Sequence, residues 1–157
     1  MIYGCVLYKN EEENIQECME SLKYISDVIV AVDNGSCDNS TEIVKKYTNN
    51  VLFSPETVID EGRNLYLQQC NELGKEQDWI FVLDADERVN KDYSKQAIRK
   101  ISEFNRDIVR IGVPIYNFIG NGRFVETVSF NRFFRNEKYI RYNNSSMEQA
   151  ERGVNNV

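Results

Sequence analysis

The feature that most restricts the fold of this chain is a repeated alternation of short apolar runs and amphipathic stretches. The four apolar runs cover residues 2–7, 28–32, 51–53 and 79–83. Apolar residues recur at helical spacing in the stretch after the first run, and Asn10 is expected to cap that helix. Strands that are apolar on both faces pack inside parallel sheets, between layers of helices. The sequence therefore predicts an α/β fold with a mainly parallel, Rossmann-like sheet flanked by helices.

The pattern changes in the second half of the chain. Apolar residues alternate with others over 109–115, and aromatic and basic residues are frequent over 123–134 and 139–142. Such segments are typical of half-buried strands and predict a small additional β region. A fourth helix is expected over 93–104, whereas the tail shows no regular pattern. One domain is expected at this length, and it divides into three parts, 1–88, 89–142 and the tail 143–157.

Histidine is absent from the chain, and its absence removes several chemistries. A Ser-His-Asp triad, a Cys-His dyad and a histidine-bound zinc are excluded. The net charge of −6 argues against a nucleic acid as partner, because phosphate recognition needs a basic surface. No apolar run approaches the roughly 20 residues that cross a bilayer, and no basic region typical of a signal peptide precedes the first strand. We therefore expect a cytoplasmic protein with four reduced, mostly buried cysteines.

Carboxylates follow two of the apolar strands directly. Asp33 ends the second run, and Asp84 and Asp86 follow the fourth. Ligands of open parallel sheets bind beyond the carboxyl ends of the strands. Two carboxylates at one strand end suit Mg²⁺ or Mn²⁺, whose remaining ligands are then phosphate and water. The alternative interpretation of this Asp-x-Asp pair is a solvated turn that caps a helix.

Four segments in order resemble the nucleotide-binding half of family 2 glycosyltransferases, which have the GT-A fold. The segments are Val6-Leu7-Tyr8-Lys9-Asn10-Glu11-Glu12, Val32-Asp33-Asn34-Gly35-Ser36, Glu61-Gly62-Arg63-Asn64 and Trp79-Ile80-Phe81-Val82-Leu83-Asp84-Ala85-Asp86-Glu87. Within the family, the sequence is most similar to bacterial enzymes of the lipopolysaccharide-core glucosyltransferase type. A later segment, Arg132-Phe133-Phe134-Arg135-Asn136, is also similar to that group.

This resemblance implies a role for each site residue. Asp33 would bind the nucleobase, usually uracil, and Tyr8 would line the base and ribose pocket. Arg63 would approach the nucleotide from the third helix, Asp84 would face the ribose and the metal, and Asp86 would ligate the metal. The implied activity is transfer of a sugar, in most such enzymes a hexose, from a UDP-sugar to a glycan, lipid-linked or protein acceptor, with inversion and with Mn²⁺ or Mg²⁺ as cofactor.

The general base is the position where this sequence departs from the family. Related sequences often have a His-Glu pair after the Arg-rich segment, and here Met147 precedes Glu148. Glu148 is the candidate catalytic base, and Glu126 is the second candidate. The missing histidine keeps open a second function, that of a nucleotide-sugar binding module without turnover. A phosphotransferase with an aspartate nucleophile is disfavoured, because that class places its Asp-x-Asp motif after the first strand.

Charge and aromatic residues are concentrated in the segment 118–142. The half of the chain to which it belongs, 81–157, carries 13 basic and 10 acidic side chains, whereas 1–80 carries 6 and 15. One interpretation is a strand layer with apolar side chains inside and basic ones outside. The other is a platform for an anionic acceptor or for peripheral contact with a membrane, or a contact between copies in a homo-oligomer.

Overall fold

The computed structural model describes residues 1–54, 58–92, 100–101, 104–126, 129–143 and 150–152. Helices and strands alternate through the first half, and strands alone follow. The elements are β1 (Ile2–Tyr8), α1 (Ile15–Ile25), β2 (Val28–Asp33), α2 (Ser40–Val44), β3 (Val51–Phe53), α3 (Ile59–Leu73), β4 (Trp79–Val82), β5 (Arg110–Val113), β6 (Tyr116–Phe118), β7 (Phe124–Glu126), β8 (Phe130–Arg135), β9 (Ile140–Tyr142) and β10 (Ala150–Arg152).

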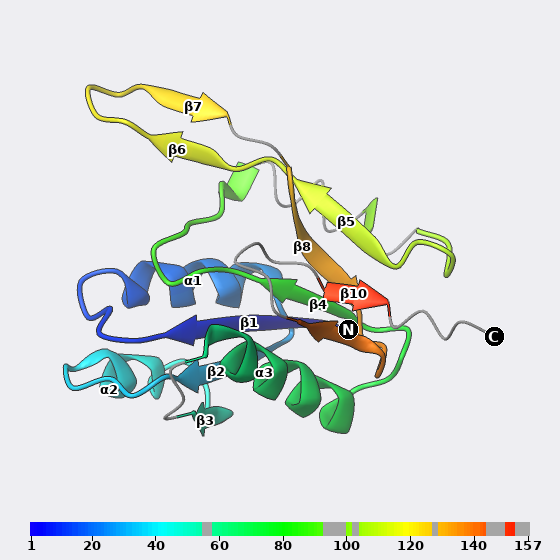
Figure 1. Cartoon of the computed structure of the whole chain (residues 1–157). Helices are drawn as coiled ribbons and strands as arrows, with labels where there is room; N and C mark the ends of the chain where they lie inside the picture. Colours follow the sequence, from blue (N-terminus) through cyan, green and yellow to red (C-terminus); the bar gives the residue numbers. More distant parts are fainter. Residues whose placement is uncertain (55–57, 93–99, 102–103, 127–128, 144–149, 153–157) are drawn as a thin grey trace.

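A six-stranded sheet forms the centre of the molecule, in the order β3-β2-β1-β4-β8-β5 (Figure 1). The pairs β2–β3, β1–β2 and β1–β4 are parallel, whereas β8 runs antiparallel to both β4 and β5. The predicted α/β fold with a mainly parallel sheet and an additional β region is confirmed. Because β8 joins the sheet beside β4, both expected halves of the chain contribute to one sheet.

Two apolar clusters lie on opposite faces of the sheet. One contains α1 with Val6, Ala31, Phe81 and Phe133, and the other contains α3 with Cys5, Val30, Ile80 and Phe134. Neighbouring residues of each strand thus enter different clusters, as the two-residue period of a strand requires. The apolar runs of the sequence are explained by this arrangement, since the inner strands have no face toward water.

The first helix begins later than expected. It starts at Ile15, with Asn14 at the N-cap position, so the prediction that Asn10 caps it is wrong. Asn10 instead adopts a left-handed backbone conformation (φ 55°), which asparagine tolerates better than most residues. The expected fourth helix falls largely outside the described residues. The tail was expected to lack regular structure, but β10 lies within it and pairs antiparallel with β9.

The second half buries two of its arginines. Arg132 and Arg135, both in β8, are only 4% and 7% exposed. The guanidinium of Arg135 lies 3.9 Å from the centre of the Trp79 ring and donates to the carbonyl oxygens of Gln77 and Phe104. The interpretation that basic residues of segment 118–142 all face outward is therefore wrong.

All four cysteines are free thiols, and all but Cys37 are buried. The longest helix in the described part of the chain, α3, has 15 residues, and no helix there is long and apolar enough to span a membrane.

Candidate functional site

The site is built where β2, β1 and β4 end side by side. Tyr8 and Asp33 are register partners at the ends of β1 and β2, and Asp84 follows β4 on the other side of β1. The site residues that the sequence predicted at the ends of β2 and β4, the two strands that flank β1, thus lie at one edge of the sheet. Ligands of parallel sheets bind at this edge.

Asp33 is held by neutral hydrogen-bond donors. Its Oδ1 accepts the backbone N–H groups of Gly35 and Ser36 at 3.1 and 2.8 Å, and its Oδ2 accepts the Thr41 hydroxyl. Gly35 has φ 87°, a conformation that favours glycine and folds the chain back over the carboxylate. A carboxylate has about four lone-pair positions, so one acceptor position remains for a further donor.

Tyr8 lies in the core below Asp33. Its ring is buried and its hydroxyl donates to the Thr41 hydroxyl at 3.2 Å. Burial raises the pKa of Tyr8 to about 12, although the bond to Thr41 works against that rise. The phenol therefore stays neutral at ordinary pH. It extends a chain of hydroxyls that fixes the Asp33 carboxylate, and it contributes no open surface to the site.

The loops after β1 and β2 are tied together by side chain to backbone hydrogen bonds. The amide of Cys37 donates to Asn10 Oδ1 at 2.7 Å, and the amides of Glu11 and Glu12 donate to Ser40 Oγ and Asp38 Oδ2 at 2.7 and 3.0 Å. These bonds explain the late start of α1, because residues 10–12 pair with the neighbouring loop instead of entering a helix. The result is a pre-organised rim beside Asp33.

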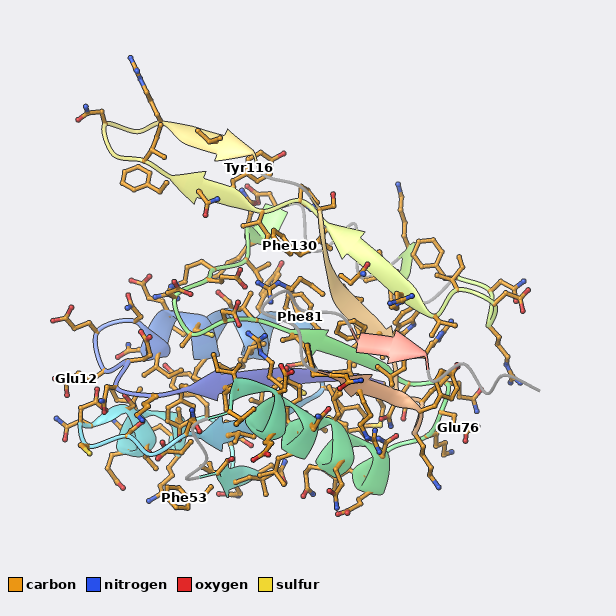
Figure 2. All side chains as sticks on the ribbon, viewed as in Figure 1. Glu12, Phe53, Glu76, Phe81, Tyr116 and Phe130 are labelled. Atoms are coloured by element: carbon orange, nitrogen blue, oxygen red, sulfur yellow. The ribbon has the colours of Figure 1, made fainter. Side chains whose placement is uncertain are left out.

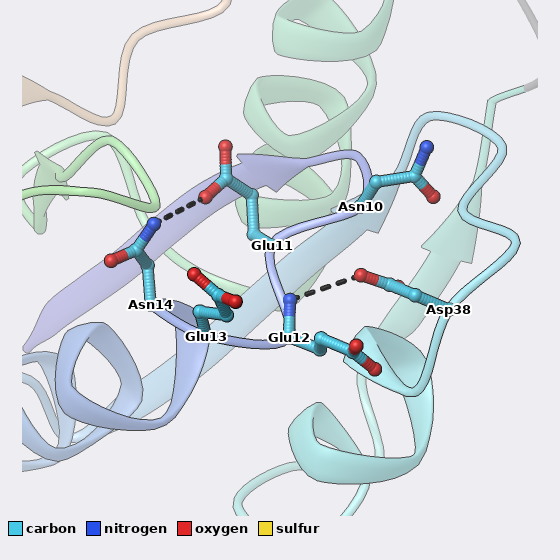
Figure 3. A pocket seen from close by; sticks show the side chains of 6 residues that line it. All are labelled: Asn10, Glu11, Glu12, Glu13, Asn14 and Asp38. Atoms are coloured by element: carbon cyan, nitrogen blue, oxygen red, sulfur yellow. Dashed lines mark hydrogen bonds between the residues drawn. The ribbon is translucent and has the colours of Figure 1, made fainter.

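Residues of this rim line a hollow of about 190 Å³ (Figure 3). Its lining contains four carboxylates and two amides, those of Asn10, Glu11, Glu12, Glu13, Asn14 and Asp38. The hollow is smaller than typical ligand pockets of about 300–1,000 Å³, and its negative charge disfavours a diphosphate. We therefore centre the site on Asp33 and Asp84 and not on this hollow.

Asp84 lies between two arginines that come from different elements. Arg63 of α3 donates to Asp84 Oδ1 at 3.1 Å, and Arg132 of β8 donates to Asp84 Oδ2 at 2.9 Å. Arg132 also donates to Glu87 Oε1 at 2.5 Å, and the other oxygen of Glu87 accepts the Asp84 amide at 3.0 Å. The guanidinium of Arg63 lies 5.4 Å from the centre of the Tyr142 ring.

Arg132 and Glu87 are the members of this network to which sequence reasoning gave no role. Both lie in segments that resemble the family, but the motif alone does not reveal that β8 returns beside β4. Burial raises the pKa of Glu87, and the Arg132 guanidinium opposes that rise. The network is thus a partly buried set of charges whose members depend on one another.

Asp86 is exposed, and no hydrogen bond or ion pair in the described part of the chain engages its carboxylate. No three acidic or cysteine side chains among the described residues gather as a ready-made metal site. Mg²⁺ beside phosphate, however, uses only one or two protein carboxylates. The carboxylates of Asp84 and Asp86 are hard oxygen donors and fit that requirement.

The candidate base Glu148 lies outside the described residues, and Glu126 ends β7.

Comparison with known proteins places this site in context. The model of glycosyl transferase family 2 matches residues 5–154, nearly the whole chain. The lipopolysaccharide core biosynthesis glycosyltransferase LpsC of Rhizobium meliloti (strain 1021) is 30% identical over 91 residues, which cover 55% of this chain and 32% of LpsC. An uncharacterized glycosyltransferase of Rickettsia typhi, RT0209, is 26% identical over 102 residues, which cover 65% of this chain and 33% of that protein.

Solved structures give the same fold. S. aureus TarS 1–349 in complex with UDP superposes with a TM-score of 0.50 and 29% identity, covering 66% of this chain and 32% of TarS 1–349. A second structure of TarS 1–349 gives a TM-score of 0.50 and 27% identity. This chain spans about a third of the length of the relatives that it matches.

Proposed function

The chain belongs to glycosyl transferase family 2, and from this membership we propose that it is a metal-dependent transferase acting on a UDP-sugar. The sugar, a hexose, is transferred to a hydroxyl group of a glycan, lipid-linked or protein acceptor with inversion at the anomeric carbon. The observation that carries the proposal is the position of Asp33 and of the pair Asp84 and Asp86 at the carboxyl ends of β2 and β4, the two strands that flank β1. A nucleotide that lies across this edge reaches one carboxylate with its base and the others with its diphosphate.

In this proposal, the uracil ring of the nucleotide binds to the Asp33 carboxylate, which its hydrogen bonds hold in one orientation. Three neutral donors already hold Asp33, and the remaining acceptor position suits the N–H of a uracil ring. The Tyr8 hydroxyl keeps Thr41 in place behind it. The complex of the similar protein TarS with UDP supports this choice of nucleotide.

Charge favours joint binding of the diphosphate and a cation. Two guanidinium groups, those of Arg63 and Arg132, accompany three carboxyl groups at residues 84–87. The local balance is therefore one negative charge in excess when all are ionised, and a free diphosphate is repelled. Mg²⁺ or Mn²⁺ held by Asp84 and Asp86 would supply the positive charge that neutralises the phosphate oxygens as the bond to the sugar breaks.

The remaining steps belong to protein side chains and the acceptor. A carboxylate base takes the proton of the acceptor hydroxyl, the acceptor oxygen bonds to the anomeric carbon, and the bond from that carbon to UDP breaks. Attack from the face opposite UDP inverts the configuration. Glu148 is the proposed base, because it follows the Arg-rich segment where related sequences have a His-Glu pair, and Glu126 is the second candidate.

A thermal-shift titration tests the proposal. UDP is expected to raise the melting temperature only when Mn²⁺ or Mg²⁺ is present, and Asp86→Ala is expected to abolish that shift without lowering the melting temperature of the free protein. Asp92→Ala is the matched control, because Asp92 is an exposed acid that follows β4 in the sequence and has no role in the proposed site. A full shift in Asp86→Ala would contradict the metal assignment.

Turnover separates the enzyme from the binding module that Met147 keeps open. Release of UDP from a UDP-hexose, with loss of that release in Glu148→Gln, is the result expected of the transferase. Binding of UDP with Mn²⁺ but no release or transfer, with any of the three acceptor classes, would establish the binding module instead.

A further inference from the structure

The β6–β7 hairpin stands away from the six-stranded sheet and exposes its apolar side chains. It forms a separate two-stranded sheet joined by the turn Gly120-Asn121-Gly122 (Figure 1). Tyr116, Phe118 and Ile119 are 57%, 64% and 61% exposed, and Val125 is also exposed. Figure 2 shows Tyr116 on this hairpin, at the opposite end of the molecule from Phe53.

Both faces of the hairpin carry exposed apolar side chains. Residues two apart share a face of a strand, so Tyr116 and Phe118 lie on one face. Val125 pairs with Asn117, and with Ile119 it belongs to the other face. Two-stranded hairpins are marginally stable alone in water, and apolar side chains on both of their faces add a cost of hydration. An occupant that covers the hairpin must therefore surround it, which a flat protein surface does not do.

The charged and apolar residues of the hairpin indicate what kind of partner covers it. The β6–β7 hairpin contains two charged residues, Arg123 beside the turn and Glu126 at the far end of β7, in a chain whose composition is 28% charged and whose net charge is −6. Arg123 lies directly after the glycine-rich turn and opposite the exposed Ile119, whose amide donates to the Arg123 carbonyl oxygen at 3.0 Å. Apolar and aromatic side chains around a long basic one are the combination that enters the headgroup region of a bilayer, with the guanidinium at the phosphates.

We propose that the β6–β7 hairpin inserts into the interfacial layer of a bilayer that contains anionic phospholipid. Phe118 and Ile119 enter the acyl boundary, Tyr116 lies at headgroup depth, and Arg123 pairs with lipid phosphate. The turn of the hairpin and the carboxyl ends of β1 and β4 point toward the same side of the molecule (Figure 1). If the proposed transferase function holds, on which this last step rests, the hairpin brings the site to a lipid-linked acceptor.

Flotation of the full chain with vesicles tests the insertion without using the transferase activity. The protein is expected to float with vesicles of phosphatidylcholine and phosphatidylglycerol, and more weakly with phosphatidylcholine alone. The double variant Phe118→Ser/Ile119→Ser is expected to weaken binding about a hundredfold on both vesicle types, because each of the two buried apolar side chains contributes about a factor of ten. Phe53→Ser is the matched control, since Phe53 is 65% exposed on the far edge strand β3, and its binding is expected to be unchanged.

The basic residue gives an independent reading. Arg123→Gln is expected to weaken binding about fivefold on anionic vesicles and to leave binding to neutral ones unchanged, because one basic side chain near an anionic surface contributes about that factor. The UDP and Mn²⁺ thermal shift, measured on every variant, shows that the fold and the nucleotide site are intact.

Two results would overturn the proposal. The first is absence of flotation with anionic vesicles by a protein that still shows the UDP shift. The second is a dimer in sedimentation velocity that Phe118→Ser/Ile119→Ser dissociates, with no change in vesicle binding, because a second copy of the chain would then be the occupant. Loss of the UDP shift with retained flotation would instead count against the proposed function alone.

Discussion

Replacing Arg132 with methionine is expected to destabilise the fold more than any surface charge change. The Arg132 side chain is 5% exposed and bonds to Asp84 and Glu87, which are 31% and 21% exposed. Removing one member of a fully buried ion pair costs about 3–5 kcal/mol, because the remaining charge stays buried. Asp84 keeps Arg63 and both carboxylates retain some contact with water, so we expect the lower end, about 3 kcal/mol.

Thermal and urea unfolding measure this cost. At this chain length, 1 kcal/mol lowers the melting temperature by about 2–4 °C, so Arg132→Met is expected to lower it by roughly 6–12 °C. Lys45→Met is the matched control, because Lys45 pairs with Glu42 in an exposed i,i+3 bridge, and it should cost less than about 0.5 kcal/mol. A variant Arg132→Met as stable as the wild type would refute the reasoning, since it would mean that methionine packing offsets the loss of the ion pairs.

Two further predictions concern single side chains. Ellman's reagent at pH 8 is expected to modify one thiol of the native protein, that of Cys37, and four thiols in denaturant, because the other three cysteines are buried; reaction of more than one native thiol, or of Cys37→Ser, would contradict the burial. Ultraviolet titration should show a phenol ionising near pH 12 that Tyr8→Phe removes. Since the folded pKa of Tyr8 lies above the unfolded value of about 10, the neutral phenol favours folding below pH 10, and this contribution is lost as the pH rises from 10 to 12. The wild type should therefore lose more stability over that range than Tyr8→Phe, and equal losses would contradict the assignment.

The first half of the fold could be predicted because its inner strands, β1, β2 and β4, are covered on both faces. A strand between two helix layers has no polar face, so its sequence is a continuous apolar run that ends where the chain leaves the sheet. Asp33 and Asp84 mark those ends. Their meeting at one edge follows from the parallel direction of β1, β2 and β4, which the alternation of strands and helices already implies.

The start of the first helix could not be predicted from the same signals. Asn10 followed by Glu13 satisfies the local pattern of a capping box. In the structure the Asn10 side chain accepts the Cys37 amide, 27 residues away in the chain. That bond depends on β1 and β2 lying next to each other, and no local pattern contains this information. The tertiary contact prevails because it also satisfies amides at the rim of the site.

The position of β8 in the sheet could not be predicted from the sequence either. This position explains why the prediction of outward-facing basic residues was wrong. Arg132 has the same parity as Phe130 and Phe134, so it shares their face of the strand. In an edge strand such an arginine reaches water. Here β5 and β4 flank β8. Arg132 points toward Asp84, which Arg63 of α3 also contacts. Asp84 and Glu87 are the carboxylates that make this burial tolerable.

Two phenylalanines differ in exposure for the same reason, the sheet that their strand joins. Phe118 and Phe134 both lie in strands with aromatic neighbours, yet one is 64% exposed and the other is fully buried. The strand that joins the central sheet buries its aromatic residue, and the strand that forms the separate hairpin does not. A sequence pattern detects the strand but not the sheet to which it belongs. The role of an exposed aromatic residue in such a hairpin therefore depends on what surrounds the protein. The vesicle experiment tests this directly.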